Sequence, residues 1–152
     1  MAKGDFIFEK PEESTGFLLW RVTNLWQREI RKALERFDLT HAQFVLLAGI
    51  HWLTLEKKGV TQIVLANHTG MDPMTTSTVL RALQAKDLIA REEHHTDTRA
   101  KAVVLTATGI KTVKQAVKTV EQFDQTFFST LQKQTTAFNQ KLNTLLVANT
   151  EK

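Results

Sequence analysis

The sequence predicts a mostly α-helical protein that contains one small β-hairpin. Over most of the chain, apolar residues recur at steps of three and four, the spacing that places side chains on one face of a helix. The period changes over two short segments rich in Val, Ile and Leu, which predict strands from Leu88 to Glu93 and from Lys101 to Leu105. The polar residues between these segments predict the turn of a hairpin.

The first helix is expected to begin near Phe17 and to run for about 20 residues, because its apolar side chains keep the helical period. Thr40 and Gln43 match a capping box, in which each side chain binds the other residue's free backbone N–H. A second helix is therefore expected to start there. It is apolar on nearly all sides, so it should be central and buried.

Two shorter helices should follow. Thr61 is expected to cap a third helix that runs to His68, and Gly70 to close it, because glycine adopts a left-handed backbone at no steric cost. Asp72-Pro73 predicts the start of a fourth helix, since Asp is a favoured N-cap and Pro loses nothing at the first helical position. This fourth helix should run to about Lys86.

After the hairpin, the helical period returns from Thr106. One helix is expected to carry the apolar residues Ile110, Val113, Val117, Val120, Phe127 and Leu131, and a last one Phe138, Leu142, Leu145 and Leu146. Two short helices joined at a glycine turn and followed by a hairpin have the order of a winged helix-turn-helix. We therefore predict a winged helix-turn-helix domain over residues 39–106.

Composition excludes several classes of protein. The 152 residues suffice for one globular domain or two small interlocked ones. Because the chain has no Cys, it has no disulfide, thiolate metal ligand, cysteine nucleophile or thiol switch. The longest apolar run, Phe44 to Ile50, is too short to cross a bilayer, and the start lacks the apolar stretch of a secretory signal. We therefore expect a cytoplasmic protein that does not enter a membrane.

The positive charge is concentrated in the middle of the chain. Residues 57–118 carry ten basic and five acidic groups, a net charge of +5, whereas the whole chain has +4. A basic segment between nearly neutral ends is typical of a nucleic-acid surface, although a solvated face with surplus lysines has the same composition.

One face of the fourth helix is suited to DNA. At about 100° per residue, Thr76, Val79, Leu80 and Leu83 should face the core. No acidic residue lies between Pro73 and Lys86, and short hydroxyls and Arg can contact phosphates and base edges in the major groove. The residues predicted to contact DNA from this helix are Met74, Thr75, Ser77, Thr78 and Arg81.

The hairpin supplies further candidates. Arg99 at its tip, with Arg91 and Lys101 on the strands, fits a minor groove whose negative potential attracts guanidinium groups, and Asp97 could hold Arg99 extended. Glu92 and Glu93 on the same hairpin weaken the electrostatic argument. No metal site is predicted from His94, His95 and Asp97, because adjacent histidines in an extended segment point to opposite faces.

The segment from Asp97-Thr98-Arg99 to Leu105-Thr106, followed by Gly109, resembles the wing signature D-x-R and L-T-x-x-G of the MarR family of winged-helix regulators. Two other stretches are similar to the family's second-helix entry and its helix-turn-helix: Leu39-Thr40 with Gln43 and Leu47, and Leu65-Ala66 through Gly70, Ser77 and Leu83 to Leu88-Ile89. The chain departs from the family in having Asp87 where Gly is common and Thr78 where a basic residue is common.

The resemblance implies a homodimer whose terminal helices, residues 14–38 and 107–148, form a dimerisation region. It also implies binding to double-stranded DNA at a palindromic operator, with the wing contact made by Arg99 and its partner Asp97. Family members often bind small aromatic ligands between the dimer helices and the DNA lobe. The candidate lining here is Trp20, Trp26, Phe44, His51 and Trp52, although aromatic residues at helical spacing more often belong to a core.

The favoured function is therefore a dimeric, sequence-specific transcriptional repressor released by a ligand, with no cofactor. An enzyme is not expected, because the sequence has no Gly-rich phosphate loop, nucleophile elbow or H-E-x-x-H motif. The alternative is a winged helix that binds protein instead of specific DNA. Such a module would carry acidic or large apolar residues on the exposed face of the fourth helix, where Met74 is the only example.

Overall fold

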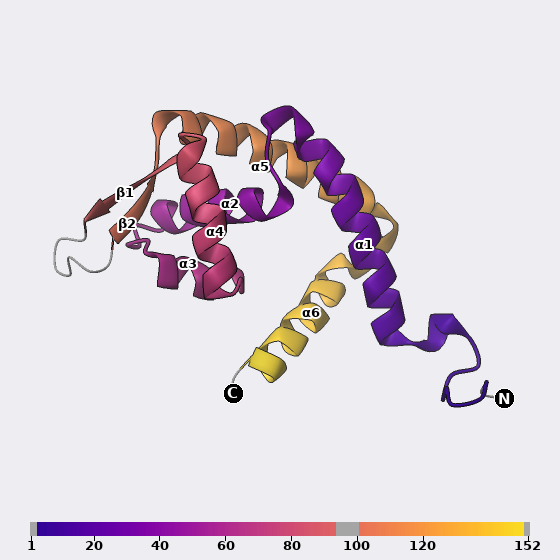
Figure 1. Cartoon of the computed structure of the whole chain (residues 1–152). Coiled ribbons are helices and arrows are strands. Elements are labelled where there is room, and N and C mark those ends of the chain that lie inside the picture. Colours follow the sequence, from indigo (N-terminus) through magenta and orange to yellow (C-terminus); the bar gives the residue numbers. More distant parts are fainter. Residues whose placement is uncertain (1–2, 94–100, 151–152) are drawn as a thin grey trace. The chain divides into compact units, whose positions relative to one another are not determined.

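The computed structural model describes residues 3–93 and 101–150. These residues form six α-helices and one two-stranded sheet, in the order that the sequence predicts (Figure 1). The elements are α1 (Thr15–Leu34), α2 (His41–Leu55), α3 (Gln62–Thr69), α4 (Pro73–Ala85), β1 (Ile89–Glu93), β2 (Lys101–Leu105), α5 (Ala107–Phe127) and α6 (Thr135–Thr150), with short 3-10 turns η1 (Pro11–Glu13), η2 (Glu35–Phe37) and η3 (Ser129–Gln134).

The chain divides into two compact units, residues 1–120 and 121–152. The first contains α1 to β2 and most of α5. The second contains the end of α5 and α6. The predicted grouping of 14–38 with 107–148 concerns a dimer, and it stays a prediction. No helix among the described residues is long and apolar enough to cross a membrane.

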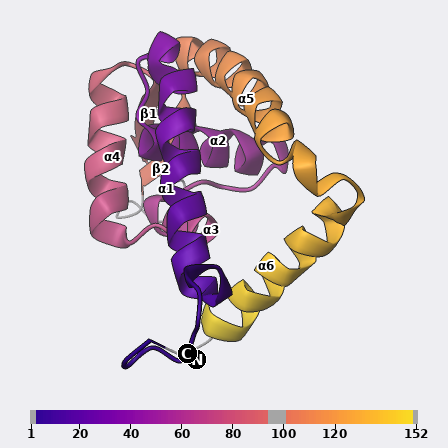
Figure 2. The same ribbon diagram turned by 90° about the vertical axis from the view of Figure 1, so that its right-hand side faces the viewer.

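We call residues 39–106 the central lobe. Helix α2 lies in its middle and contacts α3, α4 and β2, and α4 and α5 lie on opposite sides of α2 (Figure 2). Apolar side chains from these elements form the core: Leu46, Leu47, Ile50, Leu65, Leu80, Leu83, Ile89 and Val103 are all nearly or completely buried. Burial of such side chains stabilises the fold by about 1.5–3 kcal/mol each.

The predicted helix caps are confirmed. The Thr40 hydroxyl accepts a hydrogen bond from the Gln43 N–H at 3.1 Å, and the Gln43 carboxamide accepts one from the Thr40 N–H at 3.2 Å. Thr61 caps α3, which ends at Gly70 with φ of 75°. These local contacts satisfy backbone groups that a helix end leaves unpaired, so the lobe's helices begin and end where their sequence signals place them.

Helix α4 ends one residue before Lys86, in a Schellman motif. The Leu88 N–H binds the Leu83 carbonyl at 3.1 Å and the Asp87 N–H binds the Gln84 carbonyl at 3.0 Å. Asp87 therefore occupies the left-handed region, with φ of 60°, at the position where Gly is common in the family. The backbone geometry is kept although the glycine is absent.

The two strands pair antiparallel, and the L-T-x-x-G motif joins β2 to α5. The Thr106 hydroxyl donates to the Asp87 carbonyl at 2.7 Å and accepts from the Gly109 N–H at 3.0 Å. A Cβ atom at Gly109 would lie 1.9 Å from the Leu88 carbonyl oxygen. Only glycine fits at this contact between α5 and the end of α4.

One prediction for the C-terminal part is wrong. The apolar period suggested a helix that includes Leu131, but α5 ends at Phe127 and Leu131 lies in η3. The backbone of Gln132 has φ of 51° and ψ of −121°, outside the helical region, and the Ser129 hydroxyl donates to the Thr126 carbonyl at 2.8 Å. Competition by such side-chain hydrogen bonds favours a turn over continued helix.

Candidate nucleic-acid interface

Helix α4 begins at a charged cap. The Asp72 carboxylate accepts hydrogen bonds from the Thr75 N–H at 2.8 Å and from the Thr75 hydroxyl at 2.6 Å. These two bonds, the hydroxyl's first, hold the pKa of Asp72 below its ordinary value. The Thr75 hydroxyl therefore donates its one proton to the Asp72 carboxylate. Toward DNA it can only accept a hydrogen bond.

The start of α4 is also tied to α3. The Gln62 side-chain amide donates to the Pro73 carbonyl at 3.4 Å, and the Thr69 hydroxyl accepts from the Met71 N–H at 3.3 Å within the turn. Together with the left-handed Gly70, these bonds fix the angle at which α4 leaves the turn. A helix-turn-helix needs such a fixed angle because the second helix must enter a groove.

The exposed face of α4 brings three of the predicted residues into contact. The Arg81 guanidinium donates to the Ser77 hydroxyl at 3.0 Å and to the Thr78 hydroxyl at 3.4 Å. Met74, one turn earlier, is 80% exposed. Thr76, Leu80 and Leu83 are fully buried on the opposite side, as the helical period predicted.

The exposed face of α4 carries no negative charge, since α4 contains no acidic residue. Arg81 has five N–H groups, of which two are used within the helix surface. The others remain for acceptors such as phosphate oxygens or the major-groove edge of guanine.

Arg91, which the sequence predicts to contact the minor groove, lies on the inner face of the hairpin. The sheet register pairs Arg91 with Val103, and Ile89 with Leu105. Alternate residues of a strand share a face, so Arg91 lies on the same face as the buried side chains of Ile89 and Val103. Its Nε and Nη2 atoms are buried and have no hydrogen-bond partner among the residues that the structure describes.

The remaining wing candidates lie at or beyond the limits of the described structure. Lys101 begins β2, where its backbone pairs with Glu93. Asp97 and Arg99 lie outside the described residues, as do His94 and His95. Their predicted roles stay predictions.

The five candidate ligand residues differ in exposure. Phe44 is buried, Trp26 and His51 are half-buried, and Trp20 and Trp52 are more than half exposed. Trp26 meets His41, a residue that the sequence did not single out, edge to face with 5.0 Å between ring centroids. Of the five, only Trp20 borders the open hollow on α1, whose lining is Leu18, Trp20, Arg21, Val22, Asn24, Leu25 and Arg28.

Comparison with known proteins agrees with this architecture. Residues 35–124 match the family model described as ArnR1-like, winged-helix domain. The chain is 41% identical over 126 residues to the uncharacterized HTH-type transcriptional regulator YdcH of Bacillus subtilis, which covers 83% of this chain and 86% of YdcH. It is 31% identical over 109 residues to the HTH-type transcriptional repressor Rv2887 of Mycobacterium tuberculosis, covering 72% of this chain and 76% of that repressor.

Among solved structures, BpsR of Bordetella bronchiseptica superposes with a TM-score of 0.81 at 26% identity, covering 93% of this chain and 97% of BpsR. The structure of BpsR was described as a mechanism for regulation of its DNA binding by 6-hydroxynicotinic acid.

A helix-turn-helix followed by a two-stranded wing, with an acid-free exposed face on the second helix, defines a DNA-binding transcriptional regulator and not an enzyme. The chain belongs to the MarR family of winged-helix regulators.

Proposed function

We propose that this protein is a dimeric repressor that binds a palindromic operator in the cytoplasm and leaves it when a small aromatic ligand binds. The observation that carries the proposal is the exposed face of α4, where Ser77, Thr78 and Arg81 are joined by hydrogen bonds and no acidic side chain interrupts them. Placed in the major groove, this face supplies a guanidinium for guanine or phosphate and hydroxyls for base edges.

The wing acts on the neighbouring minor groove. Arg99 enters the minor groove, Asp97 orients Arg99, and Lys101 binds the DNA backbone. Arg91 acts from the inner face of the hairpin. Two of its nitrogens are buried without a partner in the described part of the chain, and such an unpaired donor costs about 1–3 kcal/mol. A shift of the wing on DNA binding would bring an acceptor to them.

Dimerisation explains the apolar surface at the two ends of the chain. Exposed large apolar side chains occur along residues 17–25 of α1 and along α6: Phe17, Leu18, Leu19, Trp20, Val22, Leu25, Leu142, Leu145, Leu146 and Val147. Proteins rarely leave large apolar patches in contact with water unless they bind a partner there. A second copy of this chain is the partner that a two-fold operator requires.

The ligand response rests on the aromatic residues of α1 and α2. Trp20, Trp26 and Trp52 keep part of their surface accessible, with His51 half-buried between the core and solvent. BpsR, whose fold matches over most of this chain, is regulated by 6-hydroxynicotinic acid. A flat aromatic acid of that size is the ligand class that we propose here, with Arg21 or Arg28 near the hollow on α1 to bind its carboxylate.

The proposal is tested by selecting duplexes from a random DNA pool with the full chain and measuring affinity for the selected duplex and a scrambled duplex at several salt concentrations. We expect a palindromic consensus and a steep loss of affinity with salt. Arg81→Ala and Arg99→Ala should each weaken binding to the selected duplex by about 10- to 100-fold. Lys133→Ala removes one charge from η3 and serves as the control.

Absence of a selected consensus, or equal affinity for selected and scrambled duplexes, would contradict specific DNA recognition. That result would favour the protein-binding module, for which the exposed Met74 on α4 is the apolar contact.

A further inference from the structure

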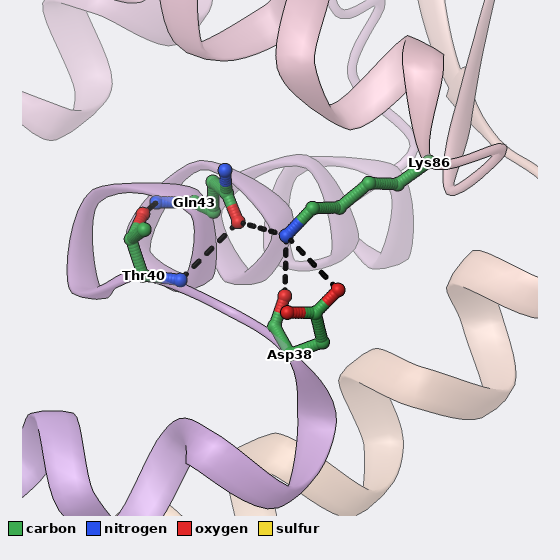
Figure 3. Close-up of polar contacts among 4 residues, drawn as sticks. All are labelled: Asp38, Thr40, Gln43 and Lys86. Atoms are coloured by element: carbon green, nitrogen blue, oxygen red, sulfur yellow. Dashed lines mark hydrogen bonds and ion pairs between the residues drawn. The ribbon is translucent and has the colours of Figure 1, made fainter.

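Lys86 follows the last residue of α4, and its side chain turns away from that helix to the junction between α1 and α2 (Figure 3). Its ammonium group donates to the Asp38 backbone carbonyl and, at 2.9 Å, to the Gln43 side-chain oxygen. It also lies 3.6 Å from a carboxylate oxygen of Asp38. All of these oxygens come from the α1–α2 junction, which is more than 40 residues away in sequence.

Gln43 receives this bond while it serves as the capping residue of α2. Its side-chain oxygen accepts from the Thr40 N–H at 3.2 Å and from Lys86 at 2.9 Å, which occupies both lone pairs. Gln43 is itself buried, with 8% of its surface exposed. The same side-chain oxygen therefore caps the start of α2 and binds the residue that follows α4.

Asp38 presents its carbonyl through a left-handed backbone, with φ of 53°. The Asp38 N–H binds the Glu35 carbonyl at 2.9 Å, so Asp38 closes the 3-10 turn at the end of α1. One ammonium group thus joins three helix ends: the end of α1, the start of α2 and the end of the DNA-reading helix α4.

The charge of Lys86 is paired within the protein. Its side chain is 31% exposed and lies against a carboxylate. Sequence arithmetic counts Lys86 among the ten basic groups of residues 57–118, but in the structure its charge is paired with Asp38. Lys86 is therefore suited to hold a position, whereas a phosphate contact needs a free cation.

We propose that Lys86 is a positioning residue for DNA recognition: it fixes the C-terminal end of α4 against the α1–α2 junction, so that the exposed face of α4 meets base edges in register. The inference rests on the DNA-binding function proposed above. Helix α4 has 13 residues, about 20 Å of helix, so a tilt of about 5° at its C-terminal end moves its N-terminal end by about 2 Å. Such a shift breaks hydrogen bonds to bases.

The variant Lys86→Met keeps an unbranched side chain out to the ε position and removes the ammonium group. Gln43→Leu removes the acceptor, whereas Gln43→Glu keeps an oxygen for both Thr40 and Lys86. Each variant is compared with the wild type by binding to the selected and scrambled duplexes over a range of salt, well below the thermal midpoint. Circular dichroism establishes that each variant is folded under these conditions.

We expect Lys86→Met and Gln43→Leu each to lower affinity for the selected duplex by about tenfold, with affinity for the scrambled duplex and the salt dependence unchanged. The double variant should lose little more than either single variant, because the two residues share one interaction. Gln43→Glu should stay within about twofold of the wild type.

Three outcomes would overturn the proposal. If Lys86→Met weakens both duplexes equally and lowers the salt slope by about one, Lys86 contacts phosphate. If Lys86→Met lowers only the thermal midpoint, the bonds from Lys86 to Asp38 and Gln43 stabilise the fold and do not position α4 for DNA. If Gln43→Glu behaves like Gln43→Leu, the acceptor oxygen is not the cause. A wild-type protein that selects no duplex would instead refute the proposed function, and this inference with it.

Discussion

The central lobe and helix α6 differ in how far their apolar side chains are buried. In the lobe, the large apolar side chains of α2, α4 and the hairpin are mostly buried against one another. Helix α6 buries none of its residues, and Leu142, Leu145, Leu146 and Val147 are all exposed. The difference is the one expected for the proposed dimer, in which one chain completes the lobe and α6 would gain its stability by packing against a second copy.

Helix α1 shows the same contrast within one element. Its last third carries Ile30 and Leu34, both fully buried in the first unit. Its first half exposes a series of apolar residues, including Leu19 and Trp20. In the proposed dimer, the buried end of α1 would belong to the core of one chain and its exposed first half to the interface.

The largest expected effect comes from charging the apolar side of α6. Leu142→Glu together with Leu146→Glu places two carboxylates one helical turn apart on that side. We expect the protein to change from dimer to monomer in analytical ultracentrifugation and to lose at least about 100-fold in affinity for a two-half-site duplex, since each half-site then binds alone.

The matched control is Thr144→Glu with Ala148→Glu, which adds the same charge and spacing at exposed positions on the opposite side of the helix. It should remain dimeric. A Leu142/Leu146 variant that is still a dimer, or a wild type that is a monomer, would remove the explanation given for the exposed apolar face.

A second prediction concerns packing within the first unit. Gly109→Ala would place a Cβ atom 1.9 Å from the Leu88 carbonyl oxygen, and backbone must move to relieve the overlap. We expect the free energy of unfolding to fall by about 3 kcal/mol in urea titration. Gly16→Ala, in the open first turn of α1, meets nothing within 4 Å and should raise it by about 0.5 kcal/mol. Equal effects at the two sites would show that the close contact is absent in solution.

The sequence predicted those parts of the fold that depend on neighbouring residues. Capping by Thr40, Thr61 and Asp72 involves partners only three residues away, so the signals are complete in the local sequence. The exposed face of α4 followed from helical period alone. Glycine at 109 was recognised as part of a motif, but the reason for it, the Leu88 carbonyl, became visible only in the structure.

Contacts between distant segments could not be predicted in this way. The bonds from Lys86 to Asp38 and Gln43 span 48 and 43 residues, and no local pattern marks them. Arg91 is a different case, because a strand's two-residue period relates it to Ile89 and could have placed it on the inner face. The sequence interpretation assigned Arg91 to DNA because of its positive charge and did not apply the two-residue period of the strand.

A smaller effect is expected at two left-handed residues in the first unit. Lys57 and Asp87 both have φ of 60° at the C-terminal ends of helices. Glycine accepts this conformation freely, and Asp tolerates it better than Lys because its short side chain bonds locally. Lys57→Gly should therefore raise the free energy of unfolding by up to about 1 kcal/mol, and Asp87→Gly by less. A larger gain at Asp87, measured by urea titration, would reverse that ranking.

The smallest effect is a pH dependence at the start of α4. Hydrogen bonds from Thr75 hold the pKa of Asp72 below its ordinary value, so the charged cap stabilises the folded state above the unfolded pKa of about 4. That contribution is lost as the pH falls through the lower pKa of the folded state. Asp72→Asn keeps an acceptor without the charge, and its thermal midpoint should lie below that of the wild type at pH 6 and approach it toward pH 2. Asp5→Asn, outside the helix, provides the baseline, and midpoints of Asp72→Asn and wild type that stay equally far apart across this range would show that the charge of the cap does not stabilise α4.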